Sequence, residues 1–400
     1  MGRSFGVAAL CVASFVAGIL VQRAYDGRTA AGGGPTAAPE STEASVTSEA
    51  PVNFAGQPLW AYGFEEPPKP GEKASPQAPP SRNLRPNEDA NEQTRKRKLE
   101  GSTAEYSLVD IRDGGNVIDW FPDMHPPMPD VVKHGPSQMK EGRRGCGSCH
   151  LPTGGGRPEN APVASLPPTY FAQQLKDFRS GARRSADPRK PNTNTMIALA
   201  KAMTDQEIQQ AAEYFGAVKW NKRVEIVETN MVPKTRIVGN LFLATEKERT
   251  QPIAGRLIEV PADEERAETF RDPRSGFVAY VPEGTLEKGK HLVTLGGATI
   301  VNNQIVQGKT TPCTACHGPD LMGLGEAPPI AGRSPSYIAR QLFDIQQGTR
   351  RGAGVELMKV VVAKLTPEDM VSISAYVASK FPPDPIEEDP ADEPEKTASR

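Results

Sequence analysis

The sequence predicts a mainly α-helical protein in which one small domain occurs twice. Three observations support this class: a repeat at a constant offset, helical patterns at matching places in both copies, and long stretches rich in Pro and Gly outside them. With 39 Pro and 37 Gly among 400 residues, much of the chain is not expected to form regular packed structure. A chain of this length is long enough for two or three domains.

The first 25 residues form a candidate export segment. Arg3 precedes an uncharged run at residues 5–21, which at about 1.5 Å per residue lies at the lower limit for spanning a bilayer. We expect residues 1–25 to be an uncleaved signal anchor or a cleaved signal peptide. Cys11 is interpreted as an apolar residue of a membrane helix. Both alternatives place the rest of the chain on the periplasmic side of a bacterial inner membrane.

Residues 26–104 and 383–400 are expected to be disordered. Both segments are rich in Pro and in small or charged residues, so they cannot bury enough apolar surface to offset the entropy lost on ordering. The first would be a tether with an end-to-end distance on the order of 50 Å, and the second an acidic tail. The basic run at residues 94–98 is interpreted as solvated charge, with lipid or an acidic partner as the alternative.

Two Cys-x-x-Cys-His motifs mark the repeat. They lie 167 residues apart and comprise Cys146, Cys149 and His150 in the first copy and Cys313, Cys316 and His317 in the second. The same offset aligns further identical residues: Pro162 with Pro329, Tyr170 with Tyr337, Gln174 with Gln341, Leu175 with Leu342, Asp177 with Asp344, Gly181 with Gly348, Arg183 with Arg350, and Arg184 with Arg351. The shared order indicates a duplicated domain.

Helices are expected at matching places in the two copies. Residues 169–178 and 336–346 carry apolar residues at three- and four-residue spacing. The offset then falls to 162, which aligns Thr204 with Thr366. Each Thr is the predicted N-cap of a final helix, because an acidic residue follows three positions later.

The predicted domains are residues 105–220 and 283–382, with residues 221–282 between them. The intervening segment contains short β-branched runs bounded by Pro and Gly, at residues 224–227, 235–238, 256–260 and 276–281. We expect strands or extended arms there. These runs either pack the two domains together or form a docking surface, and both alternatives stay open.

Each Cys-x-x-Cys-His motif predicts covalent attachment of a haem. Two cysteines three residues apart lie on one helical turn, within reach of both vinyl groups of one porphyrin, and the next residue faces the iron. A zinc ribbon would need Cys pairs much closer together, and a thioredoxin-type pair or neighbouring disulfides would not require His twice. We therefore expect two haem c groups, attached through Cys146, Cys149, Cys313 and Cys316, with His150 and His317 as axial ligands.

Met196 and Met358 are the candidate sixth ligands, because they align at the 162-residue offset. A thioether would raise the potential of the iron relative to His, and core packing is the alternative. His125 and His291 precede their motifs by 21 and 22 residues, which leaves bis-His ligation as an alternative, but their flanking sequences differ. We interpret both, and His134, as surface or buttressing histidines.

Pro162 and Pro329 each lie twelve residues after the motif His. They are either ordinary loop prolines or part of the support of the haem ligand. In the second interpretation, a carbonyl near the proline accepts the imidazole N–H and fixes the ring.

These residues resemble the class I c-type cytochromes, especially the dihaem cytochrome c4-like group. The resemblance covers about residues 120–220 and 280–382, and rests on the haem motif, the later proline, the Tyr-x-x-x-Gln-Leu helix, the Met and a final helix with Tyr214 or Tyr376. It implies three to five helices around each haem, His/Met ligation and electron transfer outside the cytoplasm. The tether and the segment between the copies depart from the group.

With both irons six-coordinate, no position remains for a substrate. We therefore expect a carrier between periplasmic or membrane redox partners, and not an enzyme. A cytochrome subunit of a membrane dehydrogenase or oxidase complex is the main alternative. A dihaem peroxidase would need a labile ligand, and a thiosulfate dehydrogenase-like enzyme would need a Cys ligand. The net charge of −2 gives no reason to expect nucleic acid as a partner.

Overall fold

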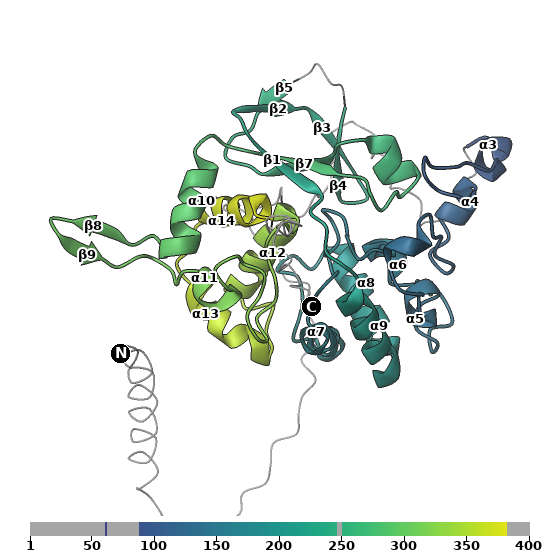
Figure 1. The fold of residues 1–400 in the computed structure, drawn as a ribbon, viewed down its shortest axis with the longest axis horizontal. Coiled ribbons are helices and arrows are strands. Elements are labelled where there is room, and N and C mark those ends of the chain that lie inside the picture. The colour runs from purple at the N-terminus through teal and green to yellow at the C-terminus, as the bar shows by residue number, and fades with distance from the viewer. Residues whose placement is uncertain (1–60, 62–87, 246–249, 382–400) are drawn as a thin grey trace, which may run out of the picture. The chain divides into compact units, whose positions relative to one another are not determined.

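The two copies of the repeat fold into matching sets of helices (Figure 1). The structure, a computed structural model, describes residues 61, 88–245 and 250–381. The first copy contains α6 (Gly147–His150), α7 (Pro168–Ser180), α8 (Pro191–Ala202) and α9 (Asp205–Ala217). The second contains α10 (Thr285–Leu295), α11 (Thr314–His317), α12 (Pro335–Gln346), α13 (Glu356–Val362) and α14 (Pro367–Ser379). The two predicted amphipathic helices are therefore present as α7 and α12.

Each copy builds its own core from the inward faces of its helices. In the first copy the buried side chains include Phe171, Leu175, Ile208, Ala211 and Phe215. In the second copy they include Ile338, Leu342, Phe343, Met370, Ile373 and Val377. Their spacing of three and four residues places each set on one face of its helix. Both cores lie next to a haem motif, because Cys146 and Cys313 pack against them.

The final helices begin at the predicted caps. The Thr204 hydroxyl accepts the Glu207 N–H at 3.1 Å, and the Glu207 carboxylate accepts the Thr204 N–H at 2.7 Å. Thr366 and Asp369 form the same reciprocal pair at 3.2 and 2.9 Å. Each pair satisfies backbone donors that the first turn of a helix leaves unbonded.

The described residues include 88–104, where a helix and a β-bridge contradict the prediction of disorder. α3 (Ala90–Thr94) lies there, and Arg97 pairs in a β-bridge with Tyr106. Leu99 is buried in a small cluster with Trp120. The basic run is neutralised locally, since Arg97 pairs with Glu92 and Lys96 with Asp110. The buried Leu99 side chain and these ion pairs hold residues 88–104 in a defined structure despite their low apolar content.

The predicted signal anchor, most of the predicted tether and nearly all of the acidic tail lie outside the described residues. Ala61 is the exception in the tether: it is buried in the second core, and its carbonyl accepts a hydrogen bond from Arg340 at 2.6 Å. No helix within the described ranges is both long and apolar enough to cross a membrane.

Three short segments precede the first haem motif: α4 (Leu108–Ile111), η1 (Pro122–Met124) and α5 (Asp130–Lys133). α4 packs with Leu99 and Trp120 in the small cluster described above. α5 packs against α9 through Val131 and Val132, which belong to the first core. α5 also contacts α6, the turn of the first haem motif.

The intervening segment forms strands at all four predicted runs. Its strands are β1 (Val224–Glu228), β2 (Met231–Pro233), β3 (Thr235–Val238), β4 (Leu241–Ala244), β5 (Thr250–Pro252), β6 (Ile258–Pro261) and β7 (Phe277–Val281). β7 lies in the middle of a three-stranded sheet, parallel to β1 and antiparallel to β6. The short helix η2 (Glu265–Thr269) joins β6 to β7. The described chain thus contains both helices and sheets, and the prediction of a mainly α-helical protein is not confirmed.

This sheet packs on the second copy. Leu257 and Val281 bury against Val371 and Ala375 of α14. The Glu259 carboxylate accepts the Ser334 hydroxyl and the Ser336 N–H at the start of α12, at 2.8 and 3.1 Å. Loop residues before β7 contact the first copy instead, so the segment touches both copies.

A hairpin that was not predicted from the sequence interrupts the second copy before its haem motif. β8 (Thr299–Val301) and β9 (Gln304–Val306) are joined by Asn302 and Asn303, whose φ angles are 50° and 59°. Positive φ at both positions is typical of a type I′ hairpin turn, which Asn tolerates. The hairpin projects away from α10 and α11 (Figure 1).

Candidate haem-binding sites

Each haem motif forms a single helical turn that begins after its first Cys and ends at its His. α6 and α11 are these turns, and no disulfide joins the four motif cysteines. Burial raises the pKa of Cys146 to about 12 and that of Cys313 to about 11. Burial thus favours the neutral form of these two sulfur atoms. Unpaired cysteines three residues apart fit thioether attachment to a haem.

The two motif histidines are held in the same way. The His150 Nδ1–H donates to the Ala161 carbonyl at 2.7 Å, and the His317 Nδ1–H donates to the Pro328 carbonyl at 2.8 Å. These carbonyls immediately precede Pro162 and Pro329, so the predicted hydrogen bond from each imidazole to a carbonyl beside the proline is present. Because Nδ1 is the donor, Nε2 is the nitrogen left to face an iron. Burial lowers the pKa of both imidazoles, which favours the neutral form that binds metal.

A cavity of about 400 Å³ brings the first set of predicted ligands together. Cys146, Cys149, His150 and Met196 all line it. Its apolar wall consists of Phe171, Leu175, Leu199 and Met203. His150 and Met196 also line a neighbouring cavity of about 110 Å³, whereas Met203 does not. The residues present therefore fit a haem, and Met196 lies in both cavities beside His150.

The second set of predicted ligands lies around the second core. Cys313 and Met358 pack against the same buried cluster, and His317 is buried. Met358 lies on α13 between Leu357 and Val360, which are 79% and 70% exposed. The Met358 side chain is thus directed inward, as is that of Val362 on the same helix, whereas Leu357 and Val360 face solvent.

The remaining histidines form hydrogen bonds within the protein. His125 uses both ring nitrogens, toward the Asp119 carboxylate at 3.1 Å and the Pro126 carbonyl at 2.9 Å. His134 Nδ1 donates to the Gly115 carbonyl, and His291 Nε2 donates to the Ala298 carbonyl, both at 2.9 Å. These contacts agree with buttressing roles, and the bis-His alternative finds no support at His125.

A two-fold-like network of matched residues joins the copies. Arg183 donates to Gln174 and Gln341 at 2.9 and 2.8 Å, and to the Tyr337 hydroxyl at 3.2 Å. Arg350, its counterpart, donates to Gln341 and Gln174 at 3.0 and 3.1 Å, and to the Tyr170 hydroxyl at 2.8 Å. Each arginine thus contacts the Tyr of the other copy, as in a symmetric dimer interface.

The repeat predicts matching positions for these residues but does not predict their contacts across the two copies. The sequence feature that could have indicated this interface is the presence of identical polar residues at matching places on the two amphipathic helices. Burial raises the pKa of Tyr337, but the guanidinium groups of Arg183 and Arg350 outweigh burial and hold that pKa below its usual range. Arg183 and Tyr337 also line the 110 Å³ cavity beside His150. The interface therefore lies directly next to the first haem site.

No protein-family model matches the chain. Cytochrome c-554(548) of Halomonas halodenitrificans is 34% identical over 73 residues, which cover 18% of this chain and 88% of that protein. The chain belongs to the c-type cytochromes. Cytochrome c4 of Pseudomonas aeruginosa is 24% identical to this cytochrome over 236 residues, 58% of the chain and 82% of the relative.

Two further comparisons involve shorter or more distant matches. The thiosulfate dehydrogenase electron acceptor of Stutzerimonas stutzeri is 31% identical over 130 residues, 32% of this chain and 57% of that protein. The crystal structure of reduced recombinant cytochrome c4 from Pseudomonas stutzeri aligns at 21% identity and a TM-score of 0.37, covering 59% of this chain and 93% of the other. Like the cytochrome c4 relatives to which it is similar, this cytochrome is a dihaem electron-transfer protein with two haem c groups.

Proposed function

We propose that this cytochrome is a His/Met-ligated electron carrier held at the periplasmic face of the inner membrane. Cys146, Cys149, Cys313 and Cys316 would attach the haems, and the axial pairs would be His150 with Met196 and His317 with Met358. The observation that carries this proposal is the identical bond from Nδ1 of each motif His to a backbone carbonyl. Each bound haem supplies one-electron chemistry at its iron.

The interface supports transfer between the two haems. Arg183 and Arg350 bond to acceptors from both copies, and the Arg184 N–H donates to the Thr349 carbonyl at 2.9 Å. Such a buried, mutually bonded network limits relative motion of the copies. A fixed arrangement of the two haem sites favours electron exchange between them within one molecule.

A carrier fits the described side chains better than an enzyme does. The motif cysteines are committed to haem attachment, so none of the cysteines that the structure describes is left as an iron ligand for a thiosulfate dehydrogenase-like site. Two Met ligands would close both irons to peroxide. The relative named thiosulfate dehydrogenase electron acceptor supports a periplasmic dehydrogenase as the class of donor. A tethered carrier and a subunit of a membrane complex both agree with that donor.

Visible spectra of the ferric protein with both haems test the axial ligands. Two low-spin haems with the weak charge-transfer band of Met–iron bonds are expected, with no ready binding of CO or cyanide. Met196→His and Met358→His should each remove about half of that band, and the double variant all of it. Met203→Leu, in the same cavity wall as Met196, is the matched control and should keep the band. A high-spin component in the unmodified protein would contradict the proposal and favour an enzymatic role.

A further inference from the structure

A loop of the intervening segment reaches the first haem-attachment turn. Arg271 Nη1 donates to the Ser148 carbonyl at 2.6 Å, and Ser148 lies between Cys146 and Cys149. The backbone of Arg271 has a φ angle of 51°, in the left-handed region that non-Gly residues rarely adopt. Strained backbone of this kind persists only where surrounding contacts hold it.

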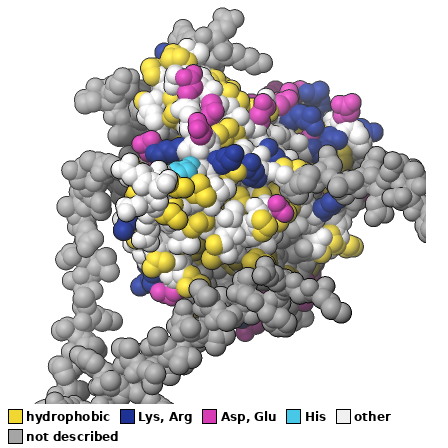
Figure 2. All heavy atoms as spheres, turned by 60° about the vertical axis from the view of Figure 1, so that its left-hand side comes forward, with side chains coloured by type: hydrophobic (Ala, Val, Ile, Leu, Met, Phe, Trp, Pro, Cys, Tyr) yellow, Lys and Arg dark blue, Asp and Glu magenta, His cyan; other side chains and the backbone are white. Residues whose placement is uncertain are grey.

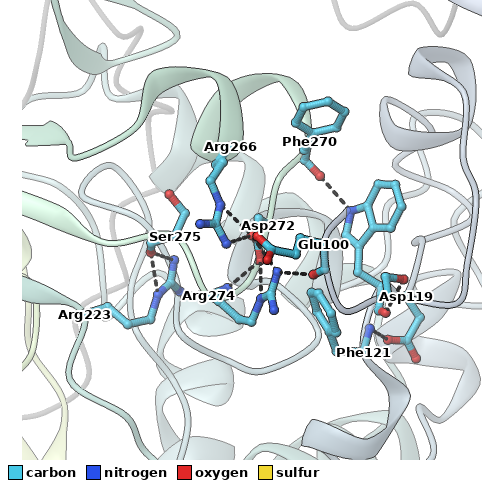
Figure 3. A network of polar contacts seen from close by, with 11 residues as sticks. Glu100, Asp119, Phe121, Arg223, Arg266, Phe270, Asp272, Arg274 and Ser275 are labelled. Atoms are coloured by element: carbon cyan, nitrogen blue, oxygen red, sulfur yellow. Dashed lines mark hydrogen bonds and ion pairs between the residues drawn. The ribbon is translucent and has the colours of Figure 1, made fainter. Parts of the chain in front are cut away.

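Buried polar contacts hold this loop in place. Asp272 is 1% exposed and accepts hydrogen bonds from the Arg266 guanidinium at 2.9 and 2.5 Å and from the Arg274 N–H at 2.9 Å. Arg223 donates to the Ser275 carbonyl at 2.9 and 2.6 Å. Figure 3 shows these arginines converging on Asp272 and Ser275. The loop is therefore rigid on both sides of Arg271.

The same loop is also attached, on either side of Arg271, to residues that precede the first haem motif. The Trp120 indole N–H donates to the Phe270 carbonyl at 2.8 Å, and Arg274 donates to the Glu100 carbonyl at 2.8 Å (Figure 3). Glu268 of η2 pairs with Arg157, which follows the haem motif in sequence. These contacts place the Arg271 charge against the first attachment turn.

The second attachment turn has no matching contact. Ala315 is the counterpart of Ser148 at the 167-residue offset. Among the described residues, no side chain forms a hydrogen bond with the Ala315 carbonyl. Arg271 belongs to the segment between the copies and has no counterpart in the repeat. The guanidinium charge therefore acts on one haem site and breaks the two-fold similarity of the pair.

We propose that Arg271 is a positioning residue that raises the reduction potential of the first haem relative to the second. A fixed positive charge favours the reduced iron, which carries one positive charge less than the oxidised iron. The hydrogen bond to Ser148 also fixes the turn that carries both thioether cysteines and His150. This inference rests on the proposed dihaem carrier. It predicts that, when the molecule holds one electron, the electron resides mainly on the first haem.

A redox titration of the full protein with both haems tests this inference. Two waves are expected, and the Met196→His and Met358→His variants assign them, because each ligand change displaces the wave of its own haem. In Arg271→Gln, the first-haem wave should move to lower potential while the second-haem wave stays in place. Arg271→Lys keeps the positive charge, so its first-haem potential should stay close to that of the unmodified protein. Arg256→Gln is the matched control, since Arg256 donates to the Ile253 and Pro252 carbonyls of its own segment.

Arg271→His gives a second test within one variant. As pH rises through the ordinary pKa of His, about 6.5, the first-haem potential of this variant should fall more than that of the unmodified protein. The second-haem potential should show no such additional fall. Unchanged waves in Arg271→Gln, or two waves that move together, would overturn the inference. A failure of the proposed dihaem carrier would be recognised separately, because the unmodified protein would then lack two low-spin haems before any Arg271 variant is measured.

Discussion

At the scale of single residues, both haem histidines depend on a backbone acceptor. Ala161 and Pro328 differ in side chain, yet each presents its carbonyl to Nδ1 of its histidine. A carbonyl acceptor cannot be removed by changing a side chain, so the orientation of the ring is robust to substitution at these positions. Iron ligation then depends mainly on the histidines and methionines themselves.

His125 should make the stability of the folded protein depend on pH. Burial lowers the pKa of His125, but the Asp119 carboxylate and the Pro126 carbonyl outweigh burial and raise that pKa. A raised pKa means that the stabilisation is fully present below the unfolded value of about 6.5 and is lost as pH rises through the folded value. His125→Gln should therefore lower the free energy of unfolding most at acidic pH, as measured by urea unfolding across pH.

Asp119→Asn provides the matched test of that ion pair. It should remove the same pH-dependent stability, and the double variant should lose little more than either single variant. If His125→Gln lowers stability equally at pH 5 and pH 8, the protonated pair is not the cause.

At the scale of elements, the final helix of the first copy depends on its cap. Thr204→Ala removes the hydroxyl that accepts the Glu207 N–H, so the free energy of unfolding should fall by about 1 kcal/mol. Thr204→Ser retains the hydroxyl and should lose much less. Thermal or urea unfolding monitored by circular dichroism measures both variants, and equal losses would show that the methyl group, not the hydroxyl, is what matters.

The β8–β9 hairpin should contribute little to stability. Ile300 and Ile305 are 74% and 81% exposed. Figure 2, which brings this side of the molecule forward, shows hydrophobic side chains interspersed with charged ones. Replacing both residues with Thr should change the free energy of unfolding by less than about 0.5 kcal/mol. Ile373→Thr in α14, where the side chain is 3% exposed, should cost about 1–3 kcal/mol in the same urea titration.

At the scale of the whole molecule, the two copies are joined mainly by polar groups. Buried guanidinium groups need acceptors, and Gln174 and Gln341 are each shared by Arg183 and Arg350. Sharing couples the two arginines, so neither contact can be changed without affecting the other. The interface thus behaves as one unit.

Removal of these arginines should be non-additive. Arg183→Ala and Arg350→Ala should each lower the free energy of unfolding by about 1–3 kcal/mol, and the double variant should lose clearly less than the sum. Arg179→Ala, which removes an arginine of α7 that bonds within the first copy, is the control and should add to either loss. Strict additivity of Arg183→Ala and Arg350→Ala would contradict a shared network.

Several parts of this organisation could be read from residue patterns. The amphipathic spacing of α7 and α12, the Thr caps and the β-branched runs of the intervening segment are local features, and the structure contains the corresponding elements. The ordered residues 88–104 were missed because their stability comes from distant partners, such as Trp120 for Leu99. The β8–β9 hairpin was missed because its strands are only three residues long.

The sequence by itself determined the duplication, the two haem c groups and the candidate ligands. These properties depend on spacing along the chain: two cysteines and a histidine on one turn, repeated at a constant offset. Only the tertiary structure decided that Arg183 meets Tyr337 and that Arg271 meets Ser148, partners 154 and 123 residues apart. Contacts over such separations depend on how the two cores and the sheet pack together, and no local pattern specifies that packing.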